Sequence, residues 1–385
     1  MPIILIVRSF IGRTPVTSPH VNGWYYKVNI KLMLNWGVLG TGEVAFDVAY
    51  AVNFVLNNKV IGVASRTAKN ATWFAENLPD AKGYADFDSL IQDPTVDVIY
   101  IATPNSTHCD MMRKCIAAGK HILCEKPFCL QSEEGREIQS LANAANVFCM
   151  EALWTRFIPA TKQIIQQLQS GDIGSIKYVK GSFGHIFSKD RCFNKDLGGG
   201  ALFDLGMYLI SLTYPILGTP DDYQFMPNIG KSGVDEQSTF TFSYKSGIIA
   251  SFHCSFLNDL ENTIEFYGEK GILKLGPPFY RTSKVRFEAQ SNTNINQGKS
   301  VRKNPYGYPG PVQKAPYFKE KLKPLLPSKT KMKNFSFTGN GYHYEIEEVY
   351  KCIKDGKLES DILPLAHSIE VVEIMNKLYA SNLVS

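Results

Sequence analysis

Five short apolar segments alternate with five amphipathic segments between residues 36 and 152, and this alternation restricts the fold more than any other feature of the chain. Strands and helices that alternate through short turns are typical of a parallel sheet with helices on both faces. We therefore predict a doubly wound α/β domain, with strands at 36–40, 59–65, 96–103, 121–126 and 147–152 and helices at 43–55, 68–78, 86–93, 107–120 and 133–146.

The pattern changes beyond about residue 155. A helix is expected at 158–171, and two more, 342–356 and 364–379, close the chain. Strand-like runs separated by turns favour antiparallel hairpins, and they lie at 175–187, 238–244, 247–256, 262–268 and 271–276. Residues 277–338 resemble a long loop or insertion. We divide the chain into an N-terminal extension (1–32), a doubly wound domain (33–153) and an α+β domain (154–385) with a basic insertion at about 290–335.

Composition excludes several classes of protein. The apolar fraction of 44% and charged fraction of 20% are those of an ordinary globular chain. No apolar run approaches the ~18 residues that span a bilayer, and no signal peptide is recognisable, so we expect no membrane span. The eight cysteines are scattered, without a C-x-x-C pair or a nearby histidine pair, which argues against a metal site. Free cysteines in apolar stretches favour a reduced, cytoplasmic location.

The net charge of +5 conceals a marked asymmetry. Residues 281–340 hold thirteen Lys and Arg against two Asp and Glu, and residues 1–32 hold four basic residues and no acidic ones. The remainder is net acidic, so we predict no nucleic-acid partner. The basic insertion suits an anionic partner or is simply a solvated loop. Residues 1–32 form a flexible arm, a segment upstream of a start at Met33, or a transit sequence.

The first strand runs into a glycine turn, Gly40-Thr41-Gly42-Glu43-Val44-Ala45, that opens a helix. In this context a G-x-G-x-x-A turn lets the backbone approach a pyrophosphate at the helix N-terminus. A site for NAD usually has an acid at the end of the second strand, but here Ser65 and Arg66 stand there. A guanidinium suits a 2′-phosphate. We therefore predict that 33–153 binds NADP(H) in preference, with NAD(H) possible.

Two further strand ends should lie at the same edge of the sheet, where ligands of open α/β sheets bind. They contribute the candidate cofactor contacts Ala102, Thr103, Pro104, Asn105, His108, Glu125 and Lys126. A Lys-Pro pair such as Lys126-Pro127 is alternatively an exposed turn.

The stretch LGGGALFDLGMYLI (197–210) places Asp204 four residues before Tyr208 in an apolar helical pattern. A buried acid needs a partner. Taken alone, Asp204 also fits a charge favoured by the helix dipole, and Tyr208 a core aromatic.

Together these motifs resemble the Gfo/Idh/MocA oxidoreductase family over 33–385. The residues that carry the resemblance are Gly40-Thr41-Gly42, ATPNSTH (102–108), Glu125-Lys126-Pro127, MEALWTRF (150–157) and GGGALFDLGMY (198–208). The last two look most like the dimeric dihydrodiol dehydrogenase and NADP-dependent D-xylose dehydrogenase group. The resemblance implies a Rossmann domain, an open-faced sheet domain, a nicotinamide cofactor, and catalytic roles for Lys126, Asp204 and Tyr208.

That assignment is chemically coherent. Oxidation of a carbinol sends hydride to the nicotinamide and needs a base for the hydroxyl proton. A nearby Lys126 should lower the pKa of Tyr208, which is otherwise a poor base, and Asp204 should hold the lysine or the substrate hydroxyl. At the domain junction Trp154, Arg156 and Phe157 either bind substrate or pack the domains together, and His185 and Arg191 are weaker substrate candidates.

The predicted activity is an NADP(H)-dependent hydride transfer with a small polyol, aldose, trans-diol or sugar derivative. A nucleotide-linked or phosphorylated sugar is the second candidate, supported only by the basic insertion. A non-catalytic dinucleotide sensor is the third. An exposed face of the second sheet would favour a homodimer.

Overall fold

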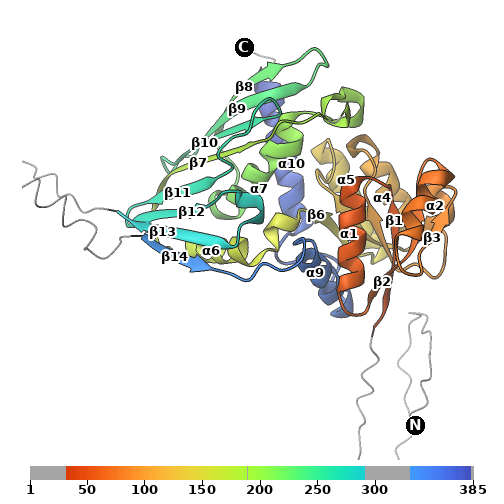
Figure 1. Ribbon diagram of the computed structural model, residues 1–385. Coiled ribbons are helices and arrows are strands. Elements are labelled where there is room, and N and C mark those ends of the chain that lie inside the picture. The colour runs from red at the N-terminus through yellow and green to blue at the C-terminus, as the bar shows by residue number, and fades with distance from the viewer. Residues whose placement is uncertain (1–31, 189, 291–329, 383–385) are drawn as a thin grey trace, which may run out of the picture. The chain divides into compact units, whose positions relative to one another are not determined.

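The computed structural model describes residues 32–188, 190–290 and 330–382 (Figure 1). Its first sheet is entirely parallel, in the order β3-β2-β1-β4-β5-β6. The strands are β1 Leu34–Leu39, β2 Asn58–Ala64, β3 Lys82–Tyr84, β4 Val98–Ile101, β5 His121–Glu125 and β6 Cys149–Ala152. The strand order reverses between β1 and β4, so ligands are expected where the carboxyl ends of these strands meet.

Five helices connect the strands of this sheet. They are α1 Glu43–Phe54, α2 Ala68–Glu76, α3 Phe87–Ile91, α4 His108–Ala117 and α5 Ser132–Ala145. Each predicted helix of the first domain is therefore present, which confirms the doubly wound α/β prediction. The short strand β3 was not predicted because only three residues, Lys82–Tyr84, pair with β2.

The second sheet has the order β14-β13-β12-β11-β7-β10-β9-β8. Only β7 and β10 run parallel, and the other neighbours are antiparallel. The strands are β7 Ile176–Gly184, β8 Asp222–Ile229, β9 Asp235–Ser243, β10 Ile249–Ser255, β11 Ile264–Gly268, β12 Gly271–Leu275, β13 Lys284–Ala289 and β14 Thr330–Asn334. A mostly antiparallel second sheet confirms the predicted α+β class of this half.

Helices cover one face of the second sheet. They are α6 Pro159–Gln169, α7 Met207–Leu217 and α10 Leu365–Asn382, and α10 also packs on α5 of the first domain (Figure 1). Helix α9, His343–Lys354, packs on α1. Buried aromatic side chains, among them Phe240, Phe242 and Phe252, fill the space beneath the helices.

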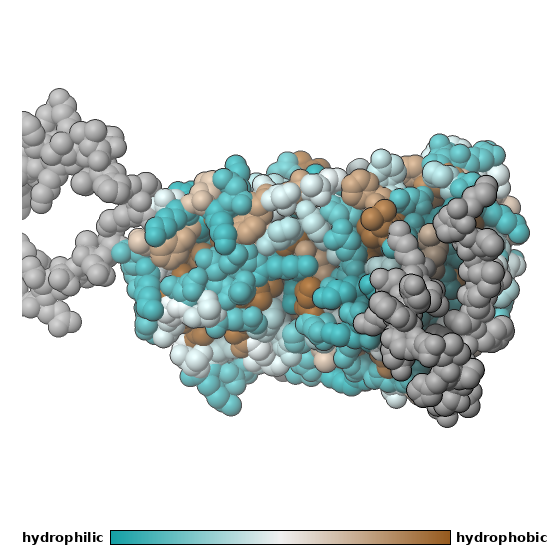
Figure 2. All heavy atoms as spheres, turned by 90° about the horizontal axis from the view of Figure 1, so that it is seen from below, coloured by the Kyte–Doolittle hydropathy of each residue, from teal (hydrophilic) through white to brown (hydrophobic). Residues whose placement is uncertain are grey.

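The opposite face of the second sheet is partly exposed. Tyr178, Met226 and Ile249 lie on it with 36%, 67% and 48% of their surface exposed. Seen from below, the molecule is largely hydrophilic, with hydrophobic side chains in small patches between polar ones (Figure 2). The sheet thus has one apolar face packed by helices and one mixed face.

The predicted loop at 277–338 is wrong at both ends, because β13 and β14 lie inside it and pair with each other. The two strands are separated by about forty residues in sequence, so no hairpin turn marks them, and the edge strand β14 has Met332 as its only apolar residue. Strand β8 was also missed, since it is a polar edge strand that contains Pro227. The middle of the basic insertion and the N-terminal extension lie outside the described residues.

One helical stretch in the described part of the chain, Lys195–Leu217, is long and apolar enough to cross a membrane by length and composition alone. Its most apolar window is 78% buried in the fold, as in a core helix, so it is weak evidence for a membrane span. All eight cysteines are buried as free thiols. No group of three or more His, Cys, Asp or Glu side chains in the described ranges is placed to hold a metal ion.

Candidate active site

The glycine turn after β1 has the shape that a dinucleotide needs. Gly40 has φ +111°, and a Cβ there would lie 2.4 Å from the carbonyl oxygen of Ala102. A Cβ on Gly42 would meet no atom within 4 Å, so the space before it is open. Gly42 precedes α1, whose first amides have no side-chain cap. An open approach to uncapped amides fits a pyrophosphate group.

The rest of the turn faces the end of β2. The hydroxyls of Thr41 and Ser65 lie 3.2 Å apart, which joins the turn to the strand end. Arg66 follows at the surface. Glu43 and Val44 form the first residues of α1 and are at least partly exposed. This set fits the adenosine half of a dinucleotide.

The loop after β4 is fastened internally. The hydroxyl of Thr107 donates to that of Thr103 at 2.8 Å and to the carbonyl oxygen of Pro104 at 2.7 Å. The fully buried His108 ring lies between the carbonyl oxygens of Thr103 and Pro127, at 3.0 and 2.9 Å. Burial lowers the pKa of His108 to about 4. His108 therefore lies between two loops as a neutral ring that donates to one of these oxygens, and this placement favours a structural role over the predicted cofactor contact.

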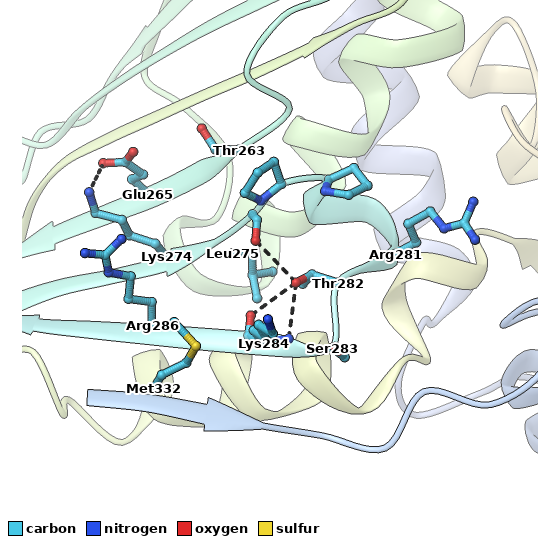
Figure 3. Close-up of a pocket in the computed structure, with 13 residues that line it drawn as sticks. Thr263, Glu265, Lys274, Leu275, Arg281, Thr282, Ser283, Lys284, Arg286 and Met332 are labelled. Carbon is cyan, nitrogen blue, oxygen red and sulfur yellow. Dashed lines mark hydrogen bonds and ion pairs between the residues drawn. The ribbon is translucent and has the colours of Figure 1, made fainter. Parts of the chain in front are cut away.

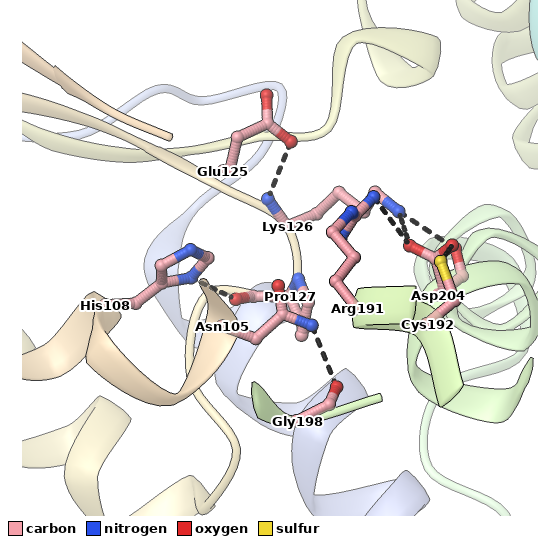
Figure 4. Close-up of polar contacts among 9 residues, drawn as sticks. All are labelled: Asn105, His108, Glu125, Lys126, Pro127, Arg191, Cys192, Gly198 and Asp204. Atoms are coloured by element: carbon pink, nitrogen blue, oxygen red, sulfur yellow. Dashed lines mark hydrogen bonds and ion pairs between the residues drawn. The ribbon is translucent and has the colours of Figure 1, made fainter. Parts of the chain in front are cut away.

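Asn105 links the two domains. Its side-chain amide is buried and donates to the carbonyl oxygen of Gly198 at 2.9 Å (Figure 4). The glycine run at 198–200 permits this approach, because a Cβ on Gly198 would lie 3.0 Å from that of Asn105. The close contacts of these glycines are with the protein itself. A Cβ on Gly199 would lie 2.4 Å from the carbonyl oxygen of Cys192.

Glu125 is directed into the protein rather than toward an open site. Its Oε1 accepts a hydrogen bond from the hydroxyl of the buried Tyr100, and its Oε2 accepts one from the backbone N–H of Lys126 at 3.3 Å. Burial raises the pKa of Glu125, although these hydrogen bonds and nearby cations oppose the shift. Glu125 thus supports the strand end that carries Lys126.

Lys126 and Asp204 form an ion pair across the two domains. The Nζ of Lys126 donates to Asp204 Oδ1 at 2.5 Å and to the Asp204 backbone oxygen at 3.0 Å (Figure 4). The two side chains are only 13% and 8% exposed. Asp204 therefore has the partner that its burial requires, and the partner comes from the other domain.

Two neighbours complete the surroundings of Asp204. A guanidinium nitrogen of Arg191 lies 4.0 Å from Oδ1, and the Cys192 thiol donates to Oδ2 at 3.7 Å. Burial alone would raise the pKa of Asp204, but the charges of Lys126 and Arg191 lower it below its usual value. Asp204 is therefore held as a carboxylate.

Tyr208 lies beside this ion pair. The Lys126 ammonium lies 5.1 Å from the centre of the Tyr208 ring. The pKa of Tyr208 is nevertheless raised, mainly by burial and then by the negative charges of Glu125 and Asp204, while a hydrogen bond from Trp154 opposes the shift. The predicted lowering of this pKa is wrong for the protein alone, because burial of Tyr208 dominates and the charges of Glu125 and Asp204 add to it. Asp204 also sits in a π turn, Leu202–Gly206, that precedes α7, not in the α-helix we expected.

Aromatic side chains surround Tyr208. Phe183 meets the Tyr208 ring edge-on at 5.3 Å and stacks with Tyr280 at 4.7 Å. Trp154 packs against Tyr280 and Tyr342, with ring centres 6.4 and 4.9 Å apart. This wall suits the faces of a sugar ring or an aromatic diol. Phe183, Tyr280 and Tyr342 were missed, since strand and loop aromatics give no sign of the site they face.

The other predicted substrate contacts differ in their placement. His185 is partly exposed, and its ring nitrogens lie 3.1 Å from the Tyr280 hydroxyl and 3.2 Å from Asp259 Oδ1. It therefore remains a candidate substrate contact beside the aromatic wall. Arg156 is buried and donates to the carbonyl oxygens of Ser211 and Ile362 at 3.0 and 2.8 Å. Phe157 is fully buried. Both placements favour the alternative role in packing.

A cationic groove lies on the second sheet. Its volume is about 520 Å³, and Glu265 pairs there with Lys274 at 3.1 Å (Figure 3). The basic side chains that line it are Lys274, Arg281, Lys284 and Arg286. The loop at its edge also carries Tyr280, so the groove and the aromatic wall share a segment.

Comparison with known proteins agrees with this geometry. Residues 34–153 match the oxidoreductase family model with an NAD-binding Rossmann fold, and 161–274 match the GFO/IDH/MocA C-terminal domain. A mouse trans-1,2-dihydrobenzene-1,2-diol dehydrogenase is 31% identical over 351 residues, which cover 90% of this chain and 96% of the relative. The Xenopus laevis enzyme of the same name is 30% identical over 349 residues, or 89% and 96% of the two chains.

Solved structures share the fold. A 3-ketoreductase from Actinomadura kijaniata, in complex with NADP and TDP-benzene, has a TM-score of 0.73 at 19% identity over 90% of this chain and 97% of that one. An aldose-aldose oxidoreductase from Caulobacter crescentus, complexed with glycerol, gives the same TM-score, identity and coverage. The chain belongs to the Gfo/Idh/MocA family and is an NAD(P)-dependent dehydrogenase or reductase.

Proposed function

We propose that the protein transfers hydride between NADP(H) and a small polyol, aldose, trans-diol or sugar derivative, with Tyr208 as acid and base. The observation that carries this proposal is the Lys126–Asp204 ion pair, which places an ammonium over the Tyr208 ring. The trans-dihydrodiol relatives and the aldose oxidoreductase neighbour support this substrate class.

Different residues bind the cofactor and move the proton. A bound nicotinamide dinucleotide supplies the site that accepts or gives the hydride. Gly40, Thr41 and Gly42 leave room for its pyrophosphate, and Arg66 provides a cation for a 2′-phosphate, which supports NADP(H) over NAD(H). During oxidation Tyr208 takes the proton of the substrate hydroxyl, and in reduction it returns one.

Lys126 and Asp204 assist this proton transfer. The Lys126 ammonium favours the phenolate of Tyr208 in the transition state, and Asp204 holds the ammonium in place. We assign to Arg191, which is half exposed beside Asp204, a contact with the substrate. The regulator alternative is overturned by membership in a family of dehydrogenases and is not retained.

The test is a screen of NADP⁺ and NAD⁺ against aldoses, polyols, sugar acids and trans-diols, followed by the absorbance of the reduced nicotinamide. We expect turnover with at least one aldose, polyol or trans-diol, and a higher kcat/KM with NADP⁺. A full panel without turnover in either direction would refute this proposal.

A nucleotide-linked or phosphorylated sugar is the second candidate. The cationic groove favours it, and the ketoreductase neighbour holds a TDP ligand. Charge reversal at Lys284 and Arg286 should then raise KM for a sugar phosphate at least ~10-fold and leave KM for a free sugar unchanged.

The assembly and location are also proposals. The partly exposed face of the second sheet supports a homodimer, which sedimentation at several concentrations would test. Eight buried free thiols support a cytoplasmic location, which imaging of the tagged full-length chain would test.

A further inference from the structure

The π turn that carries Asp204 is held by a second buried carboxylate, Asp235, the first residue of β9. Asp235 is fully buried. Its Oδ2 accepts a hydrogen bond from the backbone N–H of Leu202, at the start of the turn, at 2.8 Å. Its Oδ1 accepts one from the hydroxyl of Tyr379, on α10, at 2.5 Å. One carboxylate thus joins the second sheet, the last helix and the π turn.

The packing around Asp235 fixes the turn further. The ring of Tyr379 stacks on Phe203, the residue before Asp204, with centres 5.6 Å apart and an angle of 18°. The N–H of Asp204 donates to the carbonyl oxygen of Gly200 at 3.0 Å. Gly200 has φ +129°, and a Cβ there would lie 2.5 Å from Asp235 Oδ1. Gly200, Leu202 and Phe203 therefore each lie against Asp235 or Tyr379.

The place of this turn matters because Lys126 contacts Asp204 through two oxygens. One is on the side chain and the other on the backbone, at 2.5 and 3.0 Å. A shift of the turn would change both contacts together and would move the ammonium relative to the Tyr208 ring. A misplacement of about 1 Å can cost ~100-fold in rate.

We propose that Asp235, together with Tyr379, is a positioning residue that sets the place of Asp204 and so of the Lys126 ammonium. The proposal rests on the proposed function, in which Lys126, Asp204 and Tyr208 handle the proton. Asp235 is not itself catalytic, because the groups it contacts are Leu202, Ser238 and Tyr379.

The test compares Asp235→Asn and Tyr379→Phe with a matched control, Ser238→Ala. Ser238 donates to the same Oδ2 at 2.6 Å but lies on the same strand as Asp235, so its loss leaves the link to the turn intact. We expect kcat to fall ~10–100-fold in Asp235→Asn and ~3–10-fold in Tyr379→Phe. We expect less than ~2-fold in Ser238→Ala, and NADPH affinity within ~2-fold of the unchanged protein in all three.

A second readout does not depend on turnover. The reactivity of the Lys126 amine toward an amine reagent, measured at that residue by mass spectrometry, should rise in Asp235→Asn and Tyr379→Phe, as in Asp204→Asn, and stay unchanged in Ser238→Ala. If the unchanged protein turns over no substrate, the proposed function fails, but this labelling still tests the role of Asp235.

Two results would overturn the inference. One is unchanged kcat and unchanged Lys126 labelling in folded Asp235→Asn and Tyr379→Phe. The other is a loss of kcat matched by an equal loss of NADPH affinity in both variants, which would indicate that the whole protein is destabilised rather than that Asp204 is displaced. If Asp235→Asn does not fold, Tyr379→Phe alone decides by the same criteria.

Discussion

Asp204→Asn removes a carboxylate that two cations share. Lys126 lies 2.5 Å and Arg191 4.0 Å from Oδ1, with 13% and 47% of their side chains exposed. Loss of one member of a buried ion pair costs about 3–5 kcal/mol. Asparagine keeps an oxygen that accepts from Lys126, and Arg191 reaches water, so we expect a loss of about 2–3 kcal/mol. A total stability of about 5–15 kcal/mol tolerates this loss.

The same variant changes the titration of Tyr208. Burial and Glu125 raise the pKa of Tyr208 most, and the charge of Asp204 adds to them. Without that charge the pKa of Tyr208 falls. In the oxidation direction the rate rises as Tyr208 loses its proton, so the ascending limb of the pH profile moves to lower pH. The maximal kcat falls ~10–100-fold, because a neutral amide and the backbone oxygen hold the Lys126 ammonium less firmly than the carboxylate does.

The assay is the pH profile of kcat and kcat/KM with NADP⁺, together with urea unfolding. Asp196→Asn, the same change at an exposed carboxylate of the adjoining loop, is the control and should leave both unchanged. An ascending limb that stays in place or moves to higher pH would refute the electrostatic reasoning.

Three further variants test other parts of the account. Arg66→Ala should weaken NADPH binding ~10-fold and NADH binding less than ~2-fold in a fluorescence titration, and equal losses would exclude a 2′-phosphate contact. Gly200→Ala should lower the free energy of unfolding in urea by about 3 kcal/mol or more, since its Cβ would lie 2.5 Å from Asp235 at φ +129°. Its control, Gly218→Ala, at φ +71° with no atom within 4 Å, should lower it by about 1 kcal/mol. Equal losses would contradict the steric argument. Burial lowers the pKa of His108 from 6.5 to about 4, so as the pH falls the unfolded chain takes up the His108 proton before the folded chain does. The free energy of unfolding should therefore fall by about 3 kcal/mol between pH 6.5 and 4. His108→Gln should remove this pH dependence of stability, and an unchanged dependence would assign it to other groups.

The first domain was predictable because its signals are local. The glycine turn lies directly between a strand and a helix, and each further strand is followed by its helix within a few residues. The second sheet depends on pairings that are distant in sequence. Strands β13 and β14 are separated by about forty residues, so no hairpin turn marks their pairing.

The site was predictable in part. Lys126, Asp204 and Tyr208 came from motifs that resemble a known family, and the structure brings the three together. The surroundings that set their charge balance come from elements far apart in sequence. Glu125, at the end of β5, raises the pKa of Tyr208. Asp235, at the start of β9, accepts a hydrogen bond from the π turn. Neither effect has a signature in residue spacing.

The aromatic wall likewise could not be predicted from the sequence. Phe183 belongs to a strand and Tyr280 to a loop, and each is ordinary in its local sequence. The packing of β7 against α7 brings Phe183 against the Tyr208 ring, and Tyr280 stacks on Phe183. Arg156 and Phe157, chosen for their place at the domain junction, are instead buried in it.

The central claim is that the Tyr208 hydroxyl carries the proton, and Tyr208→Phe tests it most directly. Phenylalanine keeps the ring contacts with Lys126 and Phe183 and removes only the hydroxyl. We predict that kcat falls ~10²–10⁴-fold while the NADPH dissociation constant stays within ~2-fold, and that Tyr214→Phe on the same helix retains activity. Turnover of Tyr208→Phe within ~3-fold of the unchanged protein would contradict the account.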